Sequence, residues 1–401
     1  MGFIKFVISM MLTTAIAAPS ASKKTPSVKV AKEGILQLSL FTIPPEIETN
    51  LKNKTKRQAS TELENYMFEG SKPIKALGII LEIGTPPQKV IVEPDTASEI
   101  LWIQGLPDGK VRDGSKSTYF EQKASRSLQN LKRDSFISYV GQQVALDMFA
   151  DTVSVGGVSL GNMSFGIANM KHRLSYLSRN VGTMGLTIGE TNDGSVLAKL
   201  KEKHLVKNRA YSMALRKKDQ GAVTFGGYDT SKFSGPLEMF AIEDQAAEYV
   251  KAMQSLSFSN GSTSHQVVLD ENTMPDKSLT VGLDSGSPGL IIPQKYQDRI
   301  NDNECRLAIA FRSGGLGADL WIGGHFLRRS LVIYDPDQDS VYVARGADCG
   351  STMVAMDETI PKDLMGKCKE EIPELDPPAE KAAGYISSLS DEEIESLIIP
   401  A

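Results

Sequence analysis

The chain has 401 residues, of which 41% are hydrophobic and 23% are charged, and its formal net charge is −5 at pH 7. This length exceeds what one hydrophobic core usually supports, so we expect two lobes. The 34 glycines and 19 prolines, together with many short apolar runs, favour an all-β protein with a few short helices. A net acidic chain argues against nucleic acid as a partner.

The first 17 residues have the pattern of a secretory signal peptide. Lys5 precedes an apolar run over 6–16, and Ala-Ile-Ala at 15–17 fits a cleavage site. The run is too short for a permanent transmembrane helix, and no later run approaches one. We therefore expect a secreted protein, with a vacuolar or lumenal location as second choice. The sequons that would carry N-linked glycans on this route are Asn53, Asn162 and Asn260.

Residues 18–57 differ in charge from the rest of the chain. They hold eight basic and three acidic residues and end in the dibasic pair Lys56-Arg57. A cationic leader before an acidic body suggests a pro-segment that lies over an anionic cleft until a processing protease removes it. A solvated basic linker is the alternative, but the preceding signal peptide and the dibasic end favour the pro-segment.

The body follows as two successive β-rich lobes. In the N-terminal lobe, 58–240, we expect strands at 76–83, 90–92, 101–103, 136–139, 153–155 and 223–225 and a short helix at 196–205. In the C-terminal lobe, 241–349, we expect strands at 279–283, 290–292, 331–334 and 341–343. Residues 350–401 hold twelve acidic and four basic residues, which predicts a largely disordered acidic tail with at most a brief helix at 390–399.

Each lobe carries one short acidic turn at the end of an apolar run. The first is Asp-Thr-Ala-Ser at 95–98 and the second is Asp-Ser-Gly-Ser at 284–287. Two carboxylates in contact cannot both ionise easily, so Asp95 and Asp284 together would share one proton across a cleft. Such a pair activates water and protonates a leaving amine without a metal, a cofactor or a covalent intermediate.

With these turns the chain resembles the pepsin-like aspartic proteases, especially the secreted fungal ones, over about 66–345. Its landmarks are Ile-Gly-Thr-Pro-Pro-Gln at 83–88, the turn at 95–98 with Leu-Trp-Ile at 101–103, the hairpin ends at 137–139 and 151–157, and the runs at 182–186, 224–229, 231–235, 284–287, 322–328 and 332–335.

The resemblance implies a role for each matching residue. Asp95 and Asp284 would hold the attacking water. Thr96 and Ser285 would lock the two turns together, and Ser98 and Ser287 would hydrogen-bond the outer oxygens of the aspartates. The resemblance also makes Tyr139 the tyrosine of a substrate-binding flap, with Trp102 as its hydrogen-bond partner.

Several positions depart from the family pattern. Ala97 replaces the glycine of the first turn, Glu93 and Pro94 stand where the strand is usually apolar, and the flap tip at 140–143 and Gly324 also differ. Only 27 residues separate Pro293 from Trp321, so either the C-terminal lobe is shortened or the gene model lacks an exon.

We therefore consider two functions. The first is a secreted aspartic endopeptidase, made as a zymogen, that acts as a monomer on protein or peptide substrates. The second is a pseudoprotease that keeps the cleft as a peptide- or protein-binding surface. A β-rich structural protein without a cleft would leave the paired turns unexplained.

The three cysteines are Cys305, Cys349 and Cys368, which permit one disulfide and one free thiol in an oxidising compartment. Because Cys368 falls in the expected tail, we predict that Cys305 pairs with Cys349. By the resemblance, Cys305 matches the second cysteine of a family disulfide whose first cysteine falls in the missing stretch. The four histidines show no ligand spacing, so we expect no metal site.

Overall fold

The computed structural model describes residues 34–42, 77–106, 119–139, 142–168, 181–187, 194–215, 220–244, 249–253, 256–259, 265–269, 279–287, 290–293, 309–312, 320–327, 329–357, 359–361 and 363–369. These residues are mostly strands, with two short α-helices, α3 (Val196–Glu202) and α4 (Gly324–Leu327). The predicted all-β class is confirmed. The predicted signal peptide, the dibasic site and the helix at 390–399 lie outside the described residues.

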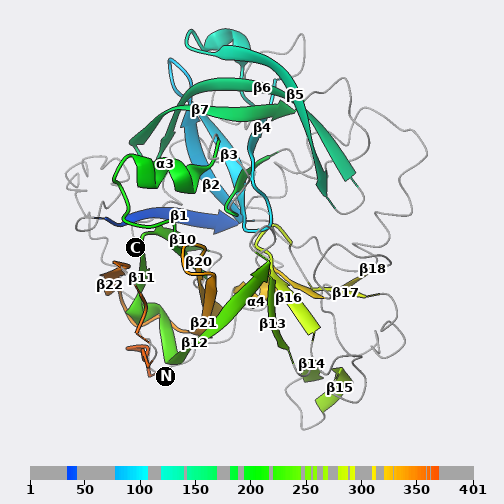
Figure 1. Cartoon of the computed structure of the whole chain (residues 1–401), viewed down its shortest axis with the longest axis vertical. Helices are drawn as coiled ribbons and strands as arrows, with labels where there is room; N and C mark the ends of the chain where they lie inside the picture. The colour runs from blue at the N-terminus through cyan, green and yellow to red at the C-terminus, as the bar shows by residue number, and fades with distance from the viewer. Residues whose placement is uncertain are drawn as a thin grey trace, which may run out of the picture.

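The upper sheet is built from the first half of the chain. Its strands are β2 (Leu77–Ile83), β3 (Gln88–Asp95), β4 (Leu101–Gln104), β5 (Gln129–Tyr139), β6 (Gln142–Val155), β7 (Val158–Ala168) and β8 (Gly182–Gly185). They lie together in the upper part of the molecule (Figure 1). β3 pairs parallel with β8, and β8 pairs antiparallel with β4.

The lower sheet repeats this plan in the second half. Its strands are β13 (Tyr249–Met253), β16 (Leu279–Leu283), β17 (Leu290–Pro293), β18 (Ile309–Arg312) and β19 (Leu320–Ile322), with the separate hairpin β14 (Leu256–Ser259) and β15 (His265–Leu269). β16 pairs parallel with β19, which pairs antiparallel with β17. In each lobe one strand, β8 or β19, thus lies between the strand before the acidic turn and the strand after it. The predicted bilobal architecture is confirmed.

A middle sheet joins the two lobes and draws on distant parts of the chain. Its strands run in the order β1 (Leu36–Thr42), β10 (Gln220–Phe225), β9 (Tyr211–Leu215), β20 (Ser330–Asp335), β21 (Ser340–Gly346) and β12 (Phe233–Asp244). β1 also pairs with β2, and β12 also pairs with β13. The predicted lobe boundary at 240 therefore falls inside a strand that links two sheets, because β12 pairs with both neighbours.

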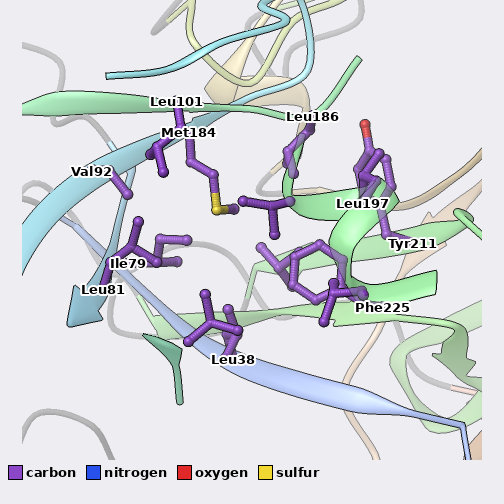
Figure 2. Close-up of a cluster of buried hydrophobic side chains, with 14 of the residues drawn as sticks. Leu38, Ile79, Leu81, Val92, Leu101, Met184, Leu186, Leu197, Tyr211 and Phe225 are labelled. Atoms are coloured by element: carbon purple, nitrogen blue, oxygen red, sulfur yellow. The ribbon is translucent and has the colours of Figure 1, made fainter. Parts of the chain in front are cut away.

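β1 comes from the predicted pro-segment. It pairs with β10 over six residues, and its inward side chains Leu36, Leu38 and Leu40 are each at most 5% exposed. Leu38 lies below Ile79 and Leu81 of β2 in the core (Figure 2). Burial of each leucine contributes about 1.5–3 kcal/mol. This part of the segment is therefore a core strand, and the rest of the segment, with the dibasic pair, lies outside the described residues.

The C-terminal residues to 369 pack on the middle sheet. β22 (Met353–Ala355) pairs with β11 (Gly227–Asp229), and Cys349 is bonded to Cys368 with a Cα–Cα distance of 5.6 Å. The predicted pairing of Cys305 with Cys349 is wrong, because the chain after residue 350 returns to the body and brings Cys368 beside Cys349. The described residues between 350 and 369 therefore belong to the body and not to the predicted tail.

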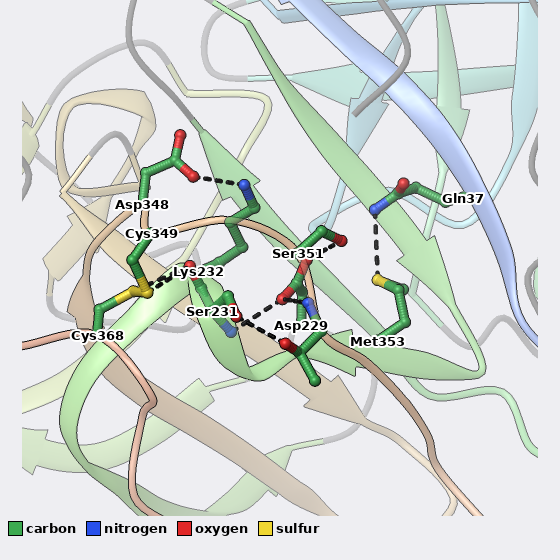
Figure 3. Close-up of polar contacts among 10 residues, drawn as sticks. Gln37, Asp229, Ser231, Lys232, Asp348, Cys349, Ser351, Met353 and Cys368 are labelled. Carbon is green, nitrogen blue, oxygen red and sulfur yellow. Dashed lines mark hydrogen bonds and ion pairs between the residues drawn. A yellow bond between two sulfur atoms is a disulfide. The ribbon is translucent and has the colours of Figure 1, made fainter.

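Asp229 is the anchor for this returning segment (Figure 3). Its Oδ1 accepts hydrogen bonds from the backbone N–H groups of Ser231 (2.9 Å) and Thr352 (2.7 Å), and its Oδ2 accepts one from the Ser351 hydroxyl (2.7 Å). Because Asp229 is buried, these donors satisfy a carboxylate that would otherwise be costly to remove from water.

Candidate active site

The two acidic turns meet between the upper and lower sheets. Asp95 is the last residue of β3, and Asp284 directly follows β16. The charge of Asp95 acts directly on the Asp284 carboxyl, which places the two acids next to each other. The backbone of the second turn also lies against Asp95, since a Cβ added at Gly286 would be 2.6 Å from Asp95 Cγ. The structure thus brings the two predicted acids into contact.

Thr96 and Ser285 join the turns by reciprocal hydrogen bonds. The Thr96 hydroxyl donates to the Leu283 carbonyl (2.7 Å), and the Ser285 hydroxyl donates to the Pro94 carbonyl (2.7 Å). Each hydroxyl also accepts the backbone N–H of the other residue, at 3.1 Å in both directions. All four bonds are buried, so they hold the loops that carry the acids in one relative position. The carbonyl acceptors, Pro94 and Leu283, were not singled out from the sequence, because any residue type supplies such a carbonyl.

The Oδ1 atoms of the two aspartates have equivalent donors. The Ala97 N–H donates to Asp95 Oδ1 (2.9 Å), and the Gly286 N–H donates to Asp284 Oδ1 (2.8 Å). Among the described non-glycine residues, positive φ angles occur only at Lys132, His204 and Asp339. The backbone at Ala97 is therefore not in the left-handed region. Alanine in place of the expected glycine causes no backbone strain there.

The fourth residues of the turns differ in what they contact. The Ser98 hydroxyl donates to Asp95 Oδ2, as expected. Ser287 is buried, and its backbone N–H donates to the Asp284 carbonyl (3.3 Å), but within the described parts of the chain its hydroxyl makes no hydrogen bond to the Asp284 carboxyl. The expected support of the outer oxygen is therefore present on the first aspartate and not on the second.

The pKa of Asp284 is raised well above its ordinary value. Removal of the carboxyl from water is the largest cause, and the charge of Asp95 is the next. The Gly286 N–H opposes the shift, while the charge of Glu93 and the hydrogen bond to Asp95 add to it. A pair in which one acid holds its proton and the other is ionised offers a general acid and a general base side by side.

Tyr139 pairs with Gln142 at the end of the β5–β6 hairpin. Trp102 is 2% exposed and packs against Val144, Leu146 and Met148 on β6. The backbone of Tyr139 is described but its side chain is not, so its contact with Trp102 stays a prediction.

The other predicted sites are placed as follows. Asn162 is exposed on β7, whereas Lys56, Arg57, Asn260 and Cys305 lie outside the described residues. Within the described ranges, no three His, Cys, Asp or Glu side chains are placed to hold a metal ion. No helix in the same ranges combines the length and the apolar character needed to cross a membrane.

Comparisons with known proteins agree with this geometry. The family described as "Eukaryotic aspartyl protease" matches residues 78–303. The acid protease of Saccharomycopsis fibuligera is 27% identical, over 66% of this chain and 79% of the relative. Candidapepsin of Candida tropicalis is 25% identical, over 66% and 77%.

A third relative is longer than the matched region. The probable aspartic-type endopeptidase OPSB of Arthroderma benhamiae is 25% identical over 73% of this chain, and the match spans 61% of that relative. The family match covers more than half of the present chain and includes both acidic turns. The chain belongs to the eukaryotic aspartyl protease family.

Proposed function

We propose that the protein is a secreted aspartic endopeptidase, made as a zymogen, that hydrolyses internal peptide bonds at acidic pH. The observation that carries the proposal is the reciprocal hydrogen bonding of Thr96 and Ser285, which holds Asp95 and Asp284 in contact. A shared-proton pair needs such support, because small displacements of a catalytic group reduce the rate strongly.

The chemistry follows from the different states of the two acids. Asp95 takes a proton from water as the water oxygen bonds to the peptide carbonyl carbon, and Asp284 gives its proton to the carbonyl oxygen. The C–N bond of the tetrahedral intermediate then breaks. The proton on Asp95 passes to the leaving nitrogen, and Asp284 recovers a proton from a hydroxyl of the intermediate. The raised pKa of Asp284 suits it to begin as the acid.

The secretory part of the proposal rests on other features. Residues 1–17 have the signal-peptide pattern, Asn162 is exposed and open to glycosylation, and a related protein of Candida albicans is named "Secreted aspartic protease 7". Activation would occur by a processing protease at Lys56-Arg57. The substrates would be proteins or peptides, and the protein would act as a monomer.

A pseudoprotease is the second candidate, and Ala97 is the observation that favours it. Its methyl group stands at the position equivalent to Gly286, where an added Cβ would clash with the opposite aspartate. In this alternative the protein binds peptides between the lobes without hydrolysing them.

The test is to express residues 18–401, acidify the protein and follow both cleavage after Arg57 and digestion of a denatured protein. Asp284→Asn should abolish digestion, because it removes the shared acid. Asp339→Asn is the matched control, since Asp339 is exposed in a left-handed turn position that asparagine also accepts. Binding of a statine-containing peptide without digestion would favour the pseudoprotease.

A further inference from the structure

A third carboxyl group lies on the strand that leads to Asp95. Glu93 is only 7% exposed, although glutamate is rarely buried. Side chains alternate along β3, so Glu93 shares a face with Ile91 and Asp95, while Val90 and Val92 point into the core. Two residues along a strand span about 7 Å.

The neighbouring strands show where this face lies. Glu93 is opposite Thr183 on β8, and Thr183 is opposite Trp102 on β4. Opposed residues of adjacent strands point to the same side, so these three side chains form one row. Trp102 packs against β6 of the β5–β6 hairpin. The row is therefore on the side of the sheet that carries Asp95 and is covered by the hairpin.

Glu93 is also next to the contact between the lobes. The carbonyl of the following residue, Pro94, accepts the hydrogen bond from Ser285, the residue after Asp284. Strands β2, β4 and β8 contact β3. Among their described residues only Glu82 on β2 is ionisable, and it lies opposite Lys89 at the other end of β3. From the second turn, the ionisable group that faces this region is Asp284.

We propose that Glu93 is a third acid of the site, a positioning residue whose charge opposes loss of the proton shared by Asp95 and Asp284. The active, singly protonated pair then persists to higher pH than the pair alone would allow. The charge of Glu93 is among the causes that raise the pKa of Asp284, which agrees with this placement. The inference deepens the proposed function and rests on it.

The test is the pH profile of kcat/KM for Glu93→Gln. Without the charge, the shared proton is lost at lower pH, so the basic limb should move by about one pH unit towards acid. Glu82→Gln, the same change on the adjacent strand beside Lys89, should leave the limb in place. Glu93→Asp retains the charge and should keep most of the wild-type profile. An unchanged basic limb in Glu93→Gln would overturn the proposal.

A second readout separates this inference from the proposed function. In protein labelled with ¹³C at the aspartate carboxyls, NMR titration should show a lower midpoint for Asp284 in Glu93→Gln than in the wild type. This measurement does not need turnover, so an inactive protein would refute the endopeptidase while still testing Glu93. If Glu93→Gln does not fold, Glu93→Leu is used in its place, because leucine suits a buried strand position. An unmoved Asp284 midpoint in the folded variant would refute the role of Glu93.

Discussion

The two acidic turns share one backbone arrangement but have different surroundings. Both aspartates receive an N–H from the third turn residue at 2.8–2.9 Å, and both turns join in the same reciprocal hydrogen bonds. Two residues before the acid, however, the first strand carries Glu93, and the second carries Gly282, against which Trp321 packs. The repeated plan thus sets the positions of the acids, and the side chains around each turn set their proton affinities.

The hydroxyl groups of the fourth turn residues, Ser98 and Ser287, also contact the two aspartates differently. Asp95 receives the hydroxyl of Ser98, but Asp284 receives no such bond from Ser287 within the described residues. The Ser98 hydroxyl therefore stabilises the Asp95 carboxylate in its charged form, whereas burial and nearby charge hold Asp284 protonated. This asymmetry suits a pair in which one group starts as base and the other as acid.

Gly286→Ala should have the largest effect. The new methyl group would lie 2.6 Å from Asp95 Cγ, closer than real contacts allow, so the Asp95 side chain or the second turn must shift. We expect kcat/KM to fall by at least about 100-fold, while thermal unfolding shows a folded protein. Activity close to that of the wild type would show that the turns do not approach as described.

Thr96→Val should test the link between the turns. Valine keeps the shape but leaves the Leu283 carbonyl and the Ser285 N–H without their buried partner. The free energy of unfolding should fall by about 2–3 kcal/mol, as measured by denaturant unfolding. Ser159→Ala, at an exposed position of β7, is the control, with a change below about 0.5 kcal/mol. Equal effects of the two variants would argue against a linking role for Thr96.

Ser98→Ala and Ser287→Ala should separate the two turns. The first removes a donor to the Asp95 carboxylate, so kcat/KM should fall by about 10-fold or more. The second removes no contact to the Asp284 carboxyl, and the expected change is less than about 3-fold. Steady-state kinetics at acidic pH provide the measurement, and equal losses would mean that the turns are functionally symmetric.

Ala97→Gly should have the smallest effect and the opposite sign. The position has no left-handed φ angle, so glycine relieves no backbone strain there. It does remove the methyl group that stands where the equivalent Gly286 has none. We expect a rise in kcat/KM of about 2- to 5-fold, which is less than 1 kcal/mol. A fall in activity would indicate that the methyl group supports the first turn.

Local sequence patterns determined much of this protein. Short apolar runs bounded by turn residues predicted the strands around both turns, because such runs are typical of buried strands. The paired Asp-Thr and Asp-Ser turns identified both acids, and the resemblance to the aspartic proteases implied the two interlocking hydroxyls. Strand ends were less predictable: the run at 136–139 belongs to the longer β5, and β7 was not expected at all.

Only the tertiary structure decided the rest. β1 belongs to the core because β10, almost two hundred residues later, offers it an open edge. Cys349 pairs with Cys368 because Asp229 and β11 hold the returning chain. The different environments of Ser98 and Ser287 and the burial of Glu93 beside the pair likewise depend on contacts between segments far apart in sequence. The type of a residue limits which contacts it can make, and the packing of distant segments determines which of these contacts form.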